Sequence, residues 1–158
     1  MRGIIFAALM LPAPGMAQDL AFDIAPLEMC LRDGGGMGCA GAAAALCMEQ
    51  SPGGETTVGM GGCLDRERAY WDDQLNAVYR EVIERAADLD VNASEYAPKQ
   101  AEALRDMQRA WIGYRDAKCS YVASQWGGGT GAGPASVSCH LHETARQMLY
   151  LQSSQLGE

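Results

Sequence analysis

The sequence predicts an all-α fold, an antiparallel helical bundle of two long helices plus a C-terminal helix, stapled by disulfides. Apolar residues recur at helical spacing in three stretches. Glycine and proline clusters separate these stretches, and short connections favour antiparallel neighbours. The chain also has six cysteines, an even number that suits disulfide pairing.

Residues 1–17 have the pattern of a secretory signal peptide. Arg2 precedes an apolar run from Ile4 to Leu11, and Gly15-Met16-Ala17 forms a small-residue boundary before Gln18. The run is shorter than the roughly 20 residues of a membrane-spanning helix, so we expect no membrane anchor after cleavage. The cleavage point has no cysteine to carry a lipid. We therefore expect a periplasmic or secreted protein.

Residues 18–62 are predicted to form a cysteine-rich helical N-terminal extension. A short helix is expected near Ile24 to Arg32, an alanine-rich helix from Ala40 to Glu49, and a loop from Ser51 to Gly62. Large apolar residues are few, so burial alone looks insufficient to offset the ordering entropy. The cysteines that would fasten this segment allow three pairings, which the sequence leaves open: Cys30, Cys39, Cys47 and Cys63.

The first long helix is predicted over residues 62–89. Its apolar positions lie three, four or seven residues apart, with charged residues between them: Leu64, Trp71, Leu75, Val78, Val82 and Ala86. The pattern stops over residues 88–98. There Asn92 or Ser94 is a candidate cap for the next helix, and Pro98 fits that helix's first turn.

The second long helix is predicted to end near Trp126, and the third to begin at Pro134 after a glycine-rich loop and to fray toward Glu158. The second helix has an expected buried stripe of Ala101, Leu104, Met107 or Gln108, Trp111, Tyr114, the Lys118 stem, and Tyr121 or Val122. The third has an expected apolar face of Val137, Leu141, Ala145, Met148 or Leu149, and Gln152. A disulfide between Cys119 and Cys139 would close the loop and contribute about 3 kcal/mol on the chain-entropy model.

The run from Trp111 to Cys119, followed by the glycine-rich loop, Cys139 and Thr144-Ala-Arg146, resembles the end of the lysozyme inhibitor LprI-like domain family, formerly a domain of unknown function. The segment from Trp71 to Tyr79 is similar to that family's first helix. The resemblance covers about residues 63–151 and places an LprI-like helical domain at 63–156. It implies an exported protein-binding module, with lysozyme as the named partner.

The excess of acidic over basic residues limits the kinds of partner that the protein can be expected to bind. Twenty Asp and Glu face twelve Lys and Arg, a net charge of −8 that becomes −9 when Arg2 is removed. Like charges repel nucleic acid and anionic lipid, so neither is expected as a partner. Opposite charge would favour docking on lysozymes, which are commonly basic. Candidate contacts on the outer face of the first long helix are Glu67, Asp72, Asp73, Glu81 and Glu84, although a solvated acidic face also serves solubility.

Arg115, Asp116 and Arg146 are the charged members of the family-like motif. A Cys119–Cys139 bridge would bring them into one neighbourhood, as a structural ion pair or as an anion-binding pair of arginines. The second use defines an alternative function: a structural or envelope-stress accessory domain that binds another envelope protein or a small anion.

Neither a metal, a cofactor nor a catalytic residue is expected. His140 and His142 are two positions apart, which on a helix is about 200 degrees, so they cannot easily share one ion. Residues 88–94 begin like a calcium loop, but Ala93 and Lys99 replace the required glycine and glutamate. Cys139 neighbours His140, yet a disulfide would abolish its use as a nucleophile. We therefore expect no enzymatic activity.

Overall fold

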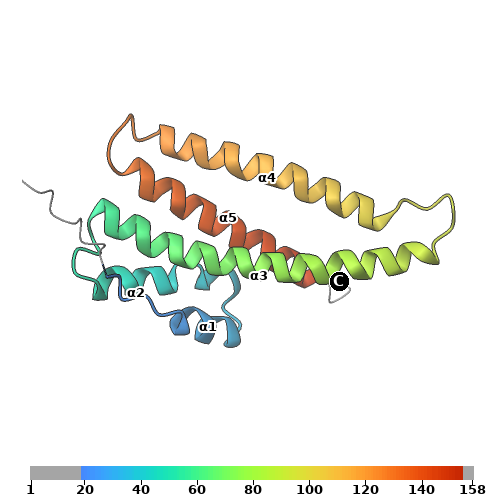
Figure 1. The fold of residues 1–158 in the computed structure, drawn as a ribbon, viewed down its shortest axis with the longest axis horizontal. Helices are drawn as coiled ribbons and strands as arrows, with labels where there is room; N and C mark the ends of the chain where they lie inside the picture. The colour runs from blue at the N-terminus through green and yellow to red at the C-terminus, as the bar shows by residue number, and fades with distance from the viewer. Residues whose placement is uncertain (1–18, 155–158) are drawn as a thin grey trace, which may run out of the picture.

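The computed structural model describes residues 19–154, and every regular element in that range is helical. The elements are α1 (Ala25–Arg32), the 3-10 turn η1 (Gly36–Cys39), α2 (Ala42–Gln50), α3 (Thr57–Val91), α4 (Gln100–Ser124) and α5 (Ala132–Ser154). Helices α3, α4 and α5 form an antiparallel bundle, with α1 and α2 on the side of α3 away from α4 (Figure 1). The predicted all-α class is confirmed. The signal peptide expected over residues 1–17 lies outside the described residues.

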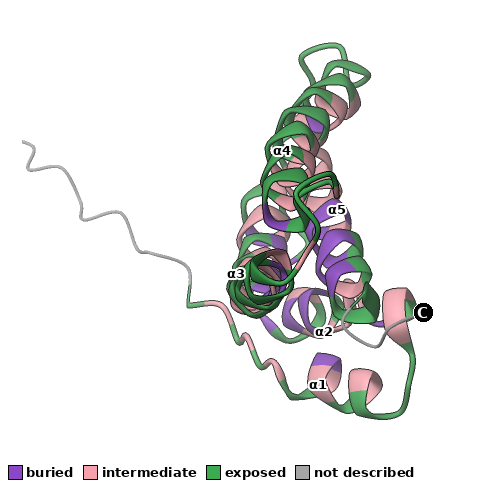
Figure 2. Cartoon of the chain, turned by 90° about the vertical axis from the view of Figure 1, so that its right-hand side faces the viewer, coloured by how far each residue is buried: buried purple, intermediate pink, exposed green. Residues whose placement is uncertain are grey.

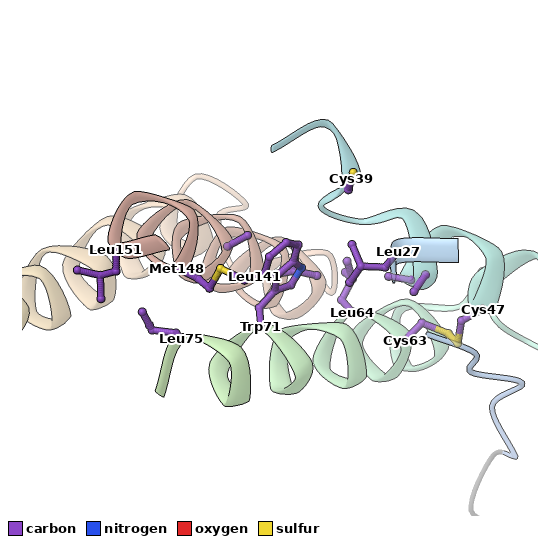
Figure 3. Packing of buried hydrophobic residues seen from close by; sticks show 13 residues of the cluster. Leu27, Cys39, Cys47, Cys63, Leu64, Trp71, Leu75, Leu141, Met148 and Leu151 are labelled. Atoms are coloured by element: carbon purple, nitrogen blue, oxygen red, sulfur yellow. A yellow bond between two sulfur atoms is a disulfide. The ribbon is translucent and has the colours of Figure 1, made fainter. Parts of the chain in front are cut away.

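The core lies between α3 and α5, and α1 and α2 cover it on the side away from α4 (Figure 2). Among the described residues, Trp71 is the largest fully buried side chain, and Figure 3 shows it beside Leu141 of α5. The buried apolar residues around it are Leu27, Ala43, Ala44, Leu64, Leu75, Leu141, Ala145, Met148 and Leu151. The spacing on α3 and α5 is the helical period that the sequence predicts, because each helix buries one face.

Helix α4 is the outermost element of the bundle. Among its residues only Ala101 and Cys119 are buried. Tyr114 is 57% exposed, so the expected buried stripe is wrong at this residue. Of the two residues expected near its end, Tyr121 is 65% exposed and Val122 is half-buried. The reason is that α4 packs along one edge against α5 and α3, while no described residue covers its other flank.

Helix α3 begins five residues before its predicted start. Thr56 is its N-cap, and the Thr56 Oγ1 accepts a hydrogen bond from the Gly59 backbone N–H at 3.1 Å. The predicted loop from Ser51 to Gly62 is therefore wrong from Thr57 onward, and the expected boundary between residues 62 and 63 falls inside a helix. Three glycines in this first stretch hid the helical signal, because glycine weakens helices and has no side chain to show periodicity.

The start of α4 is capped by a residue of α3. The Asp90 Oδ2 accepts from Ala101 N at 2.9 Å and its Oδ1 accepts from Gln100 N at 2.8 Å. These two backbone hydrogen bonds lower the pKa of Asp90, because they stabilise its charged form. The predicted caps are wrong, since Lys99 is the N-cap residue and Ser94 instead accepts a bond from Tyr96 N within the loop.

Three disulfides fasten neighbouring elements. Cys30–Cys39 joins α1 to η1, Cys47–Cys63 joins α2 to α3, and Cys119–Cys139 joins α4 to α5. The structure thus selects one of the three pairings that the sequence leaves open for the N-terminal cysteines. Two of the bridges tie an element with few buried large side chains, α2 or α4, to another helix, and Cys30–Cys39 ties α1 to the adjacent turn η1.

Replacing Cys119 and Cys139 together with serine lowers the free energy of unfolding by about 3 kcal/mol, because the unfolded chain loses its closed loop. Urea denaturation measures this loss. Amide exchange in α4 also accelerates, since α4 has little other anchorage. The matched control replaces Cys30 and Cys39 with serine, which leaves α4 exchange unchanged. Equal acceleration of α4 in both variants would contradict the assigned role of the Cys119–Cys139 bridge.

Candidate functional site

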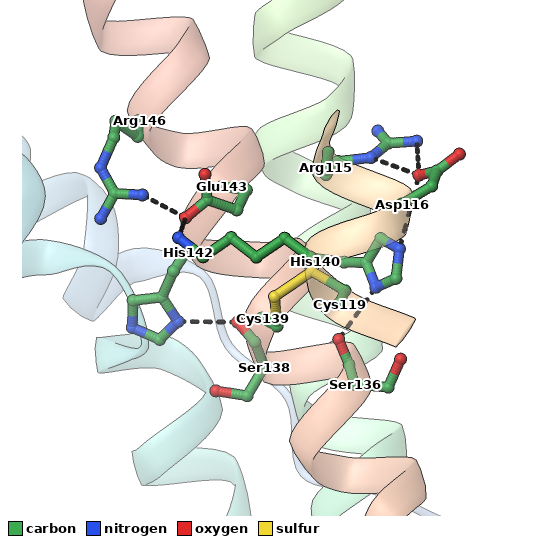
Figure 4. Close-up of a disulfide and its surroundings, with 11 residues drawn as sticks. Arg115, Asp116, Cys119, Ser136, Ser138, Cys139, His140, His142, Glu143 and Arg146 are labelled. Carbon is green, nitrogen blue, oxygen red and sulfur yellow. Dashed lines mark hydrogen bonds and ion pairs between the residues drawn. A yellow bond between two sulfur atoms is a disulfide. The ribbon is translucent and has the colours of Figure 1, made fainter. Parts of the chain in front are cut away.

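The motif residues of α4 and α5 meet around the Cys119–Cys139 disulfide (Figure 4). Arg115 donates to the Asp116 Oδ1 from its Nε at 2.9 Å and from its Nη2 at 2.8 Å. The Arg115 guanidinium lies 5.0 Å from the centre of the Trp111 ring, within cation–π range. The His140 Nε2 lies 3.6 Å from the same Asp116 oxygen. Arg115 is thus held between an aromatic ring and a carboxylate.

Arg146 belongs to a different cluster. It donates to the Glu143 Oε1, which also accepts a bond from the Lys118 Nζ at 2.7 Å. Lys118 comes from α4, so Glu143 links the two helices. Arg115 and Arg146 lie on opposite sides of the disulfide (Figure 4) and line different hollows. The disulfide thus has both arginines beside it, as expected, but in two separate clusters and not as one pair.

Glu143 is buried, and its two cationic partners, Lys118 and Arg146, stabilise its charged form. Burial by itself raises the pKa of a carboxyl group, but hydrogen bonds from Lys118 and Arg146 outweigh it and leave the pKa of Glu143 below its ordinary value. The bond to Glu143 likewise raises the pKa of Lys118. Both shifts favour the ion pair that joins α4 to α5.

Replacing Glu143 with glutamine destabilises the protein by about 2 kcal/mol at pH 6, because the bonds to charged partners weaken. A depressed carboxyl pKa stabilises the fold above the ordinary value of 4.5, and this contribution is lost as the pH falls through the lower folded value. The gap between wild type and Glu143→Gln should therefore shrink below about pH 4. Urea denaturation from pH 3 to pH 7 tests this, and a gap that stays constant would contradict it.

An open groove runs between α4 and α5 beside this cluster, with a volume of about 540 Å³. Its lining residues are Met107, Ala110, Trp111, Tyr114, Arg146, Gln147 and Tyr150. Gln147 donates to the Gln108 Oε1 at 3.0 Å and so joins the two helices. Tyr114 and Tyr150 are each 57% exposed. We name this surface the α4–α5 groove.

Sequence reasoning missed the α4–α5 groove because it assigned Tyr114 to the core. Helical spacing marks the face of α4 that carries Trp111 and Tyr114, but it does not show how much of that face a neighbour covers. Lys118 is a charged residue one helical turn after Tyr114, and its Nζ lies 5.7 Å from the centre of the Tyr114 ring. A cation over an aromatic ring is a contact that partly exposed aromatics make.

The acidic residues predicted on the outer face of α3 divide into two groups. Asp73, Glu81 and Glu84 are exposed, and Asp72 is half-buried and accepts a bond from Asn76 at 3.2 Å. Glu67, by contrast, is fully buried, so its expected role as a surface contact is wrong.

The Glu67 carboxylate caps the N-terminus of α2. Its Oε1 accepts from Gly41 N at 2.6 Å and from the Trp71 indole N–H at 3.1 Å, while its Oε2 accepts from Ala44 N at 2.8 Å. Gly41 has a φ of 99°, a left-handed conformation that glycine adopts without strain. A carboxylate is favourable there because the N–H groups that begin a helix lack partners within the helix.

Within residues 19–154 no group of three or more His, Cys, Asp or Glu side chains is placed to hold a metal ion. The His140 Nδ1 bonds to the Ser136 carbonyl at 2.9 Å and the His142 Nδ1 to the Ser138 carbonyl at 2.8 Å. Their rings point to opposite sides of α5 (Figure 4). None of the described helices is long and apolar enough to cross a membrane.

Two uncharacterized proteins are similar to this chain in sequence. An "Uncharacterized 17.7 kDa protein in puhA 5'region" of Rhodobacter capsulatus is 25% identical over 126 residues, 77% of each chain. An uncharacterized protein of Rhizobium meliloti strain 1021 is 38% identical over 88 residues, 54% of this chain and 63% of its own. No solved structure matches.

A model of one protein family, described as lysozyme inhibitor LprI, matches residues 47–151. The match starts at Cys47, inside the segment expected to be an extension, and therefore includes the Cys47–Cys63 bridge. It ends at Leu151, the last buried core residue of α5. Because the match spans the whole of α3 and α4 and nearly all of α5, this chain belongs to the lysozyme inhibitor LprI family.

Proposed function

We propose that the protein is an exported protein-binding module that inhibits lysozyme by occlusion, without enzymatic activity or a cofactor, and that it docks through the α4–α5 groove. The observation that carries the proposal is the composition of this groove, which presents Trp111, Tyr114, Tyr150 and Arg146 together. Tryptophan, tyrosine and arginine dominate the binding energy of protein interfaces. Family membership supplies lysozyme as the partner to test first.

The packing of the groove suits such a role. Two salt-linked helices hold it, since Lys118 and Glu143 bridge α4 to α5 and the Cys119–Cys139 disulfide fixes the same joint. The ordering of the aromatic side chains therefore costs less when a partner binds. An exposed aromatic surface next to charged groups at the rim resembles the usual anatomy of a protein interface.

Charge supports docking on a basic partner. The net charge of the whole chain is −8, and residues 19–62 carry six carboxylates against one arginine. An acidic surface accelerates the approach of a basic lysozyme and orients it, and salt weakens the effect because exposed charges are screened. We propose that this field acts on the association rate, while the groove supplies the close contacts.

The proposed location is the periplasm or the extracellular medium. Three disulfides among residues 30–139 are typical of proteins that mature in an oxidising compartment. A signal peptide over residues 1–17, an extension over residues 18–62 and a family domain over residues 63–156 complete the proposed organisation of the chain. Asp72, Asp73 and the pair Arg115–Asp116 are proposed as secondary contacts at the rim of the complex.

The decisive experiment replaces Tyr114 and Tyr150 together with alanine in the exported, oxidised protein. We expect the affinity for a c-type or g-type lysozyme to fall tenfold or more, about 1.4 kcal/mol, because two aromatic anchors are lost. Lysis of cell walls by the lysozyme and a binding titration at low salt measure the effect. The matched control is Tyr96→Ala, because Tyr96 is 88% exposed in the loop between α3 and α4, outside the groove lining.

If the double variant at Tyr114 and Tyr150 lost no more affinity for lysozyme than Tyr96→Ala, docking through the α4–α5 groove would be contradicted. If wild-type protein binds no lysozyme at low salt but captures another envelope protein through Tyr114 and Tyr150, the accessory-domain alternative replaces inhibition. Circular dichroism of each variant shows that the helices are retained. Raising the salt from low to moderate concentration should weaken lysozyme capture, because steering by exposed charge is screened.

A further inference from the structure

A second hollow lies where α3, α4 and α5 meet, with a volume of about 290 Å³. Its lining residues are Arg68 from α3, Arg115 from α4, and Ser136, Val137, His140 and Thr144 from α5. None of the described residues that line it is a carboxylate, although the chain has twenty of them. The lining therefore combines cationic and hydroxyl groups in an otherwise acidic protein.

Each of the two arginines is paired with one neighbouring carboxylate and keeps further guanidinium N–H groups for a ligand. Arg68 bonds to Asp65 through its Nε at 2.7 Å, and Arg115 bonds to Asp116. The arginine side chains are 33% and 19% exposed, whereas those of Asp65 and Asp116 are 57% and 53% exposed. The carboxylates thus lie further into solvent, where water screens their charge more strongly than that of the arginines.

The side chains that line the hollow are also held in place before a ligand arrives. Arg115 stacks on Trp111, and the His140 ring is fixed by the bond from its Nδ1 to the Ser136 carbonyl. Thr144 is buried, and the Cys119–Cys139 bridge holds α4 and α5 together at this point. Groups that are already ordered lose less entropy on binding.

We propose that this hollow binds a tetrahedral oxyanion, a phosphate or sulfate group. Guanidinium forks match oxyanions in geometry and charge, and hydroxyl groups can donate the remaining hydrogen bonds. Donors that come from three helices approach from three directions, which suits the non-coplanar oxygens of a tetrahedral group better than the two coplanar oxygens of a carboxylate. The hollow shares no lining residue with the α4–α5 groove, and Arg68 has no part in the proposed lysozyme contact, so the two proposals can be tested separately.

The test titrates the exported, oxidised protein with inorganic phosphate and with glycerol phosphate at low ionic strength, by calorimetry and by NMR of the His140 ring. We expect saturable binding with a shift of the His140 signals. Binding of both compounds identifies a site for any terminal phosphate group. Binding of inorganic phosphate alone identifies the free ion as the ligand, and binding of glycerol phosphate alone identifies a phosphomonoester.

Arg68→Gln and Arg115→Gln should each weaken this binding tenfold or more. Arg66→Gln is the matched control, because it removes the same charge from an exposed position of α3 that does not line the hollow. Arg105→Gln is a second control, since Arg105 lines another hollow between α3 and α4. Because Arg115→Gln also removes the contact with Trp111, Arg68→Gln keeps the test valid if that variant folds poorly.

Absence of saturable phosphate or glycerol phosphate binding would overturn the proposal. An equal loss of affinity in Arg66→Gln or Arg105→Gln would overturn it as well, because general surface charge would then explain the effect. Retained lysozyme binding in Arg68→Gln, together with lost phosphate binding, separates this site from the α4–α5 groove.

Discussion

Replacing Glu67 with alanine should lower the free energy of unfolding by about 3 kcal/mol or more, because three buried or half-buried donors lose their acceptor at once and each costs about 1 to 3 kcal/mol. The donors are the backbone N–H groups of Gly41 and Ala44 and the indole N–H of Trp71. Water cannot easily replace the carboxylate, since Glu67 is fully buried. Thermal and urea unfolding measure the loss.

Two further variants sharpen this prediction. Glu67→Gln keeps the shape but turns an amide N–H toward one of the donors, so it should fall between wild type and alanine. Glu84→Ala changes an exposed carboxylate of the same helix and should stay within about 0.5 kcal/mol of wild type. A Glu67→Ala variant as stable as Glu84→Ala would show that the cap at α2 contributes nothing.

Replacing Trp71 with alanine should cost about 3 to 5 kcal/mol, the range for removal of a buried aromatic side chain, and should open a cavity between α3 and α5. Trp71 has no exposed surface and packs within the main core cluster. Its ring also meets Tyr70 edge to face, with centroids 6.1 Å apart. Denaturant unfolding with the disulfides intact measures the loss.

The control for Trp71 is Leu89→Ala, a truncation at a position of α3 that is 52% exposed and should change stability by less than about 0.5 kcal/mol. Trp71→Phe keeps an aromatic ring and removes the bond to Glu67, so it should cost less than alanine. The losses of Glu67→Ala and Trp71→Ala should not add, because the two side chains share a hydrogen bond. Strict additivity would contradict the observed contact.

The long helices were accessible to sequence reasoning because burial of one helix face leaves a local period in the sequence. The spacing of Leu64, Trp71 and Leu75 on α3, and of Leu141 and Ala145 on α5, corresponds to side chains that are buried in the structure. The fold class follows from such patterns together with the glycine and proline breaks. The period does not show how many neighbours surround each helix, and this is why Tyr114 was misplaced.

The Glu67 cap and the hollow at Arg68 and Arg115 depend on contacts between residues that are far apart in the sequence, and a local pattern does not show such contacts. Glu67 and Gly41 are 26 positions apart, and a carboxylate flanked by charged residues resembles a surface residue in sequence. The same holds for Arg68, which no sequence motif connects with Arg115, although both line one hollow. The only hint of the Glu67 contacts in the sequence is Trp71, four positions later, because residues at that spacing meet on one helix face.

Helix α4 is secured at its two ends and sparsely between them. Asp90 holds its first turn, and the disulfide at Cys119 holds its last turns, while Ala101 and Cys119 are its only buried residues within the described chain. An element with this distribution opens as a local cooperative unit without unfolding the remainder. Such openings involve the part of α4 before the groove, whereas the disulfide and the Lys118–Glu143 pair keep the groove end fixed and the core on α3 and α5 keeps the global stability.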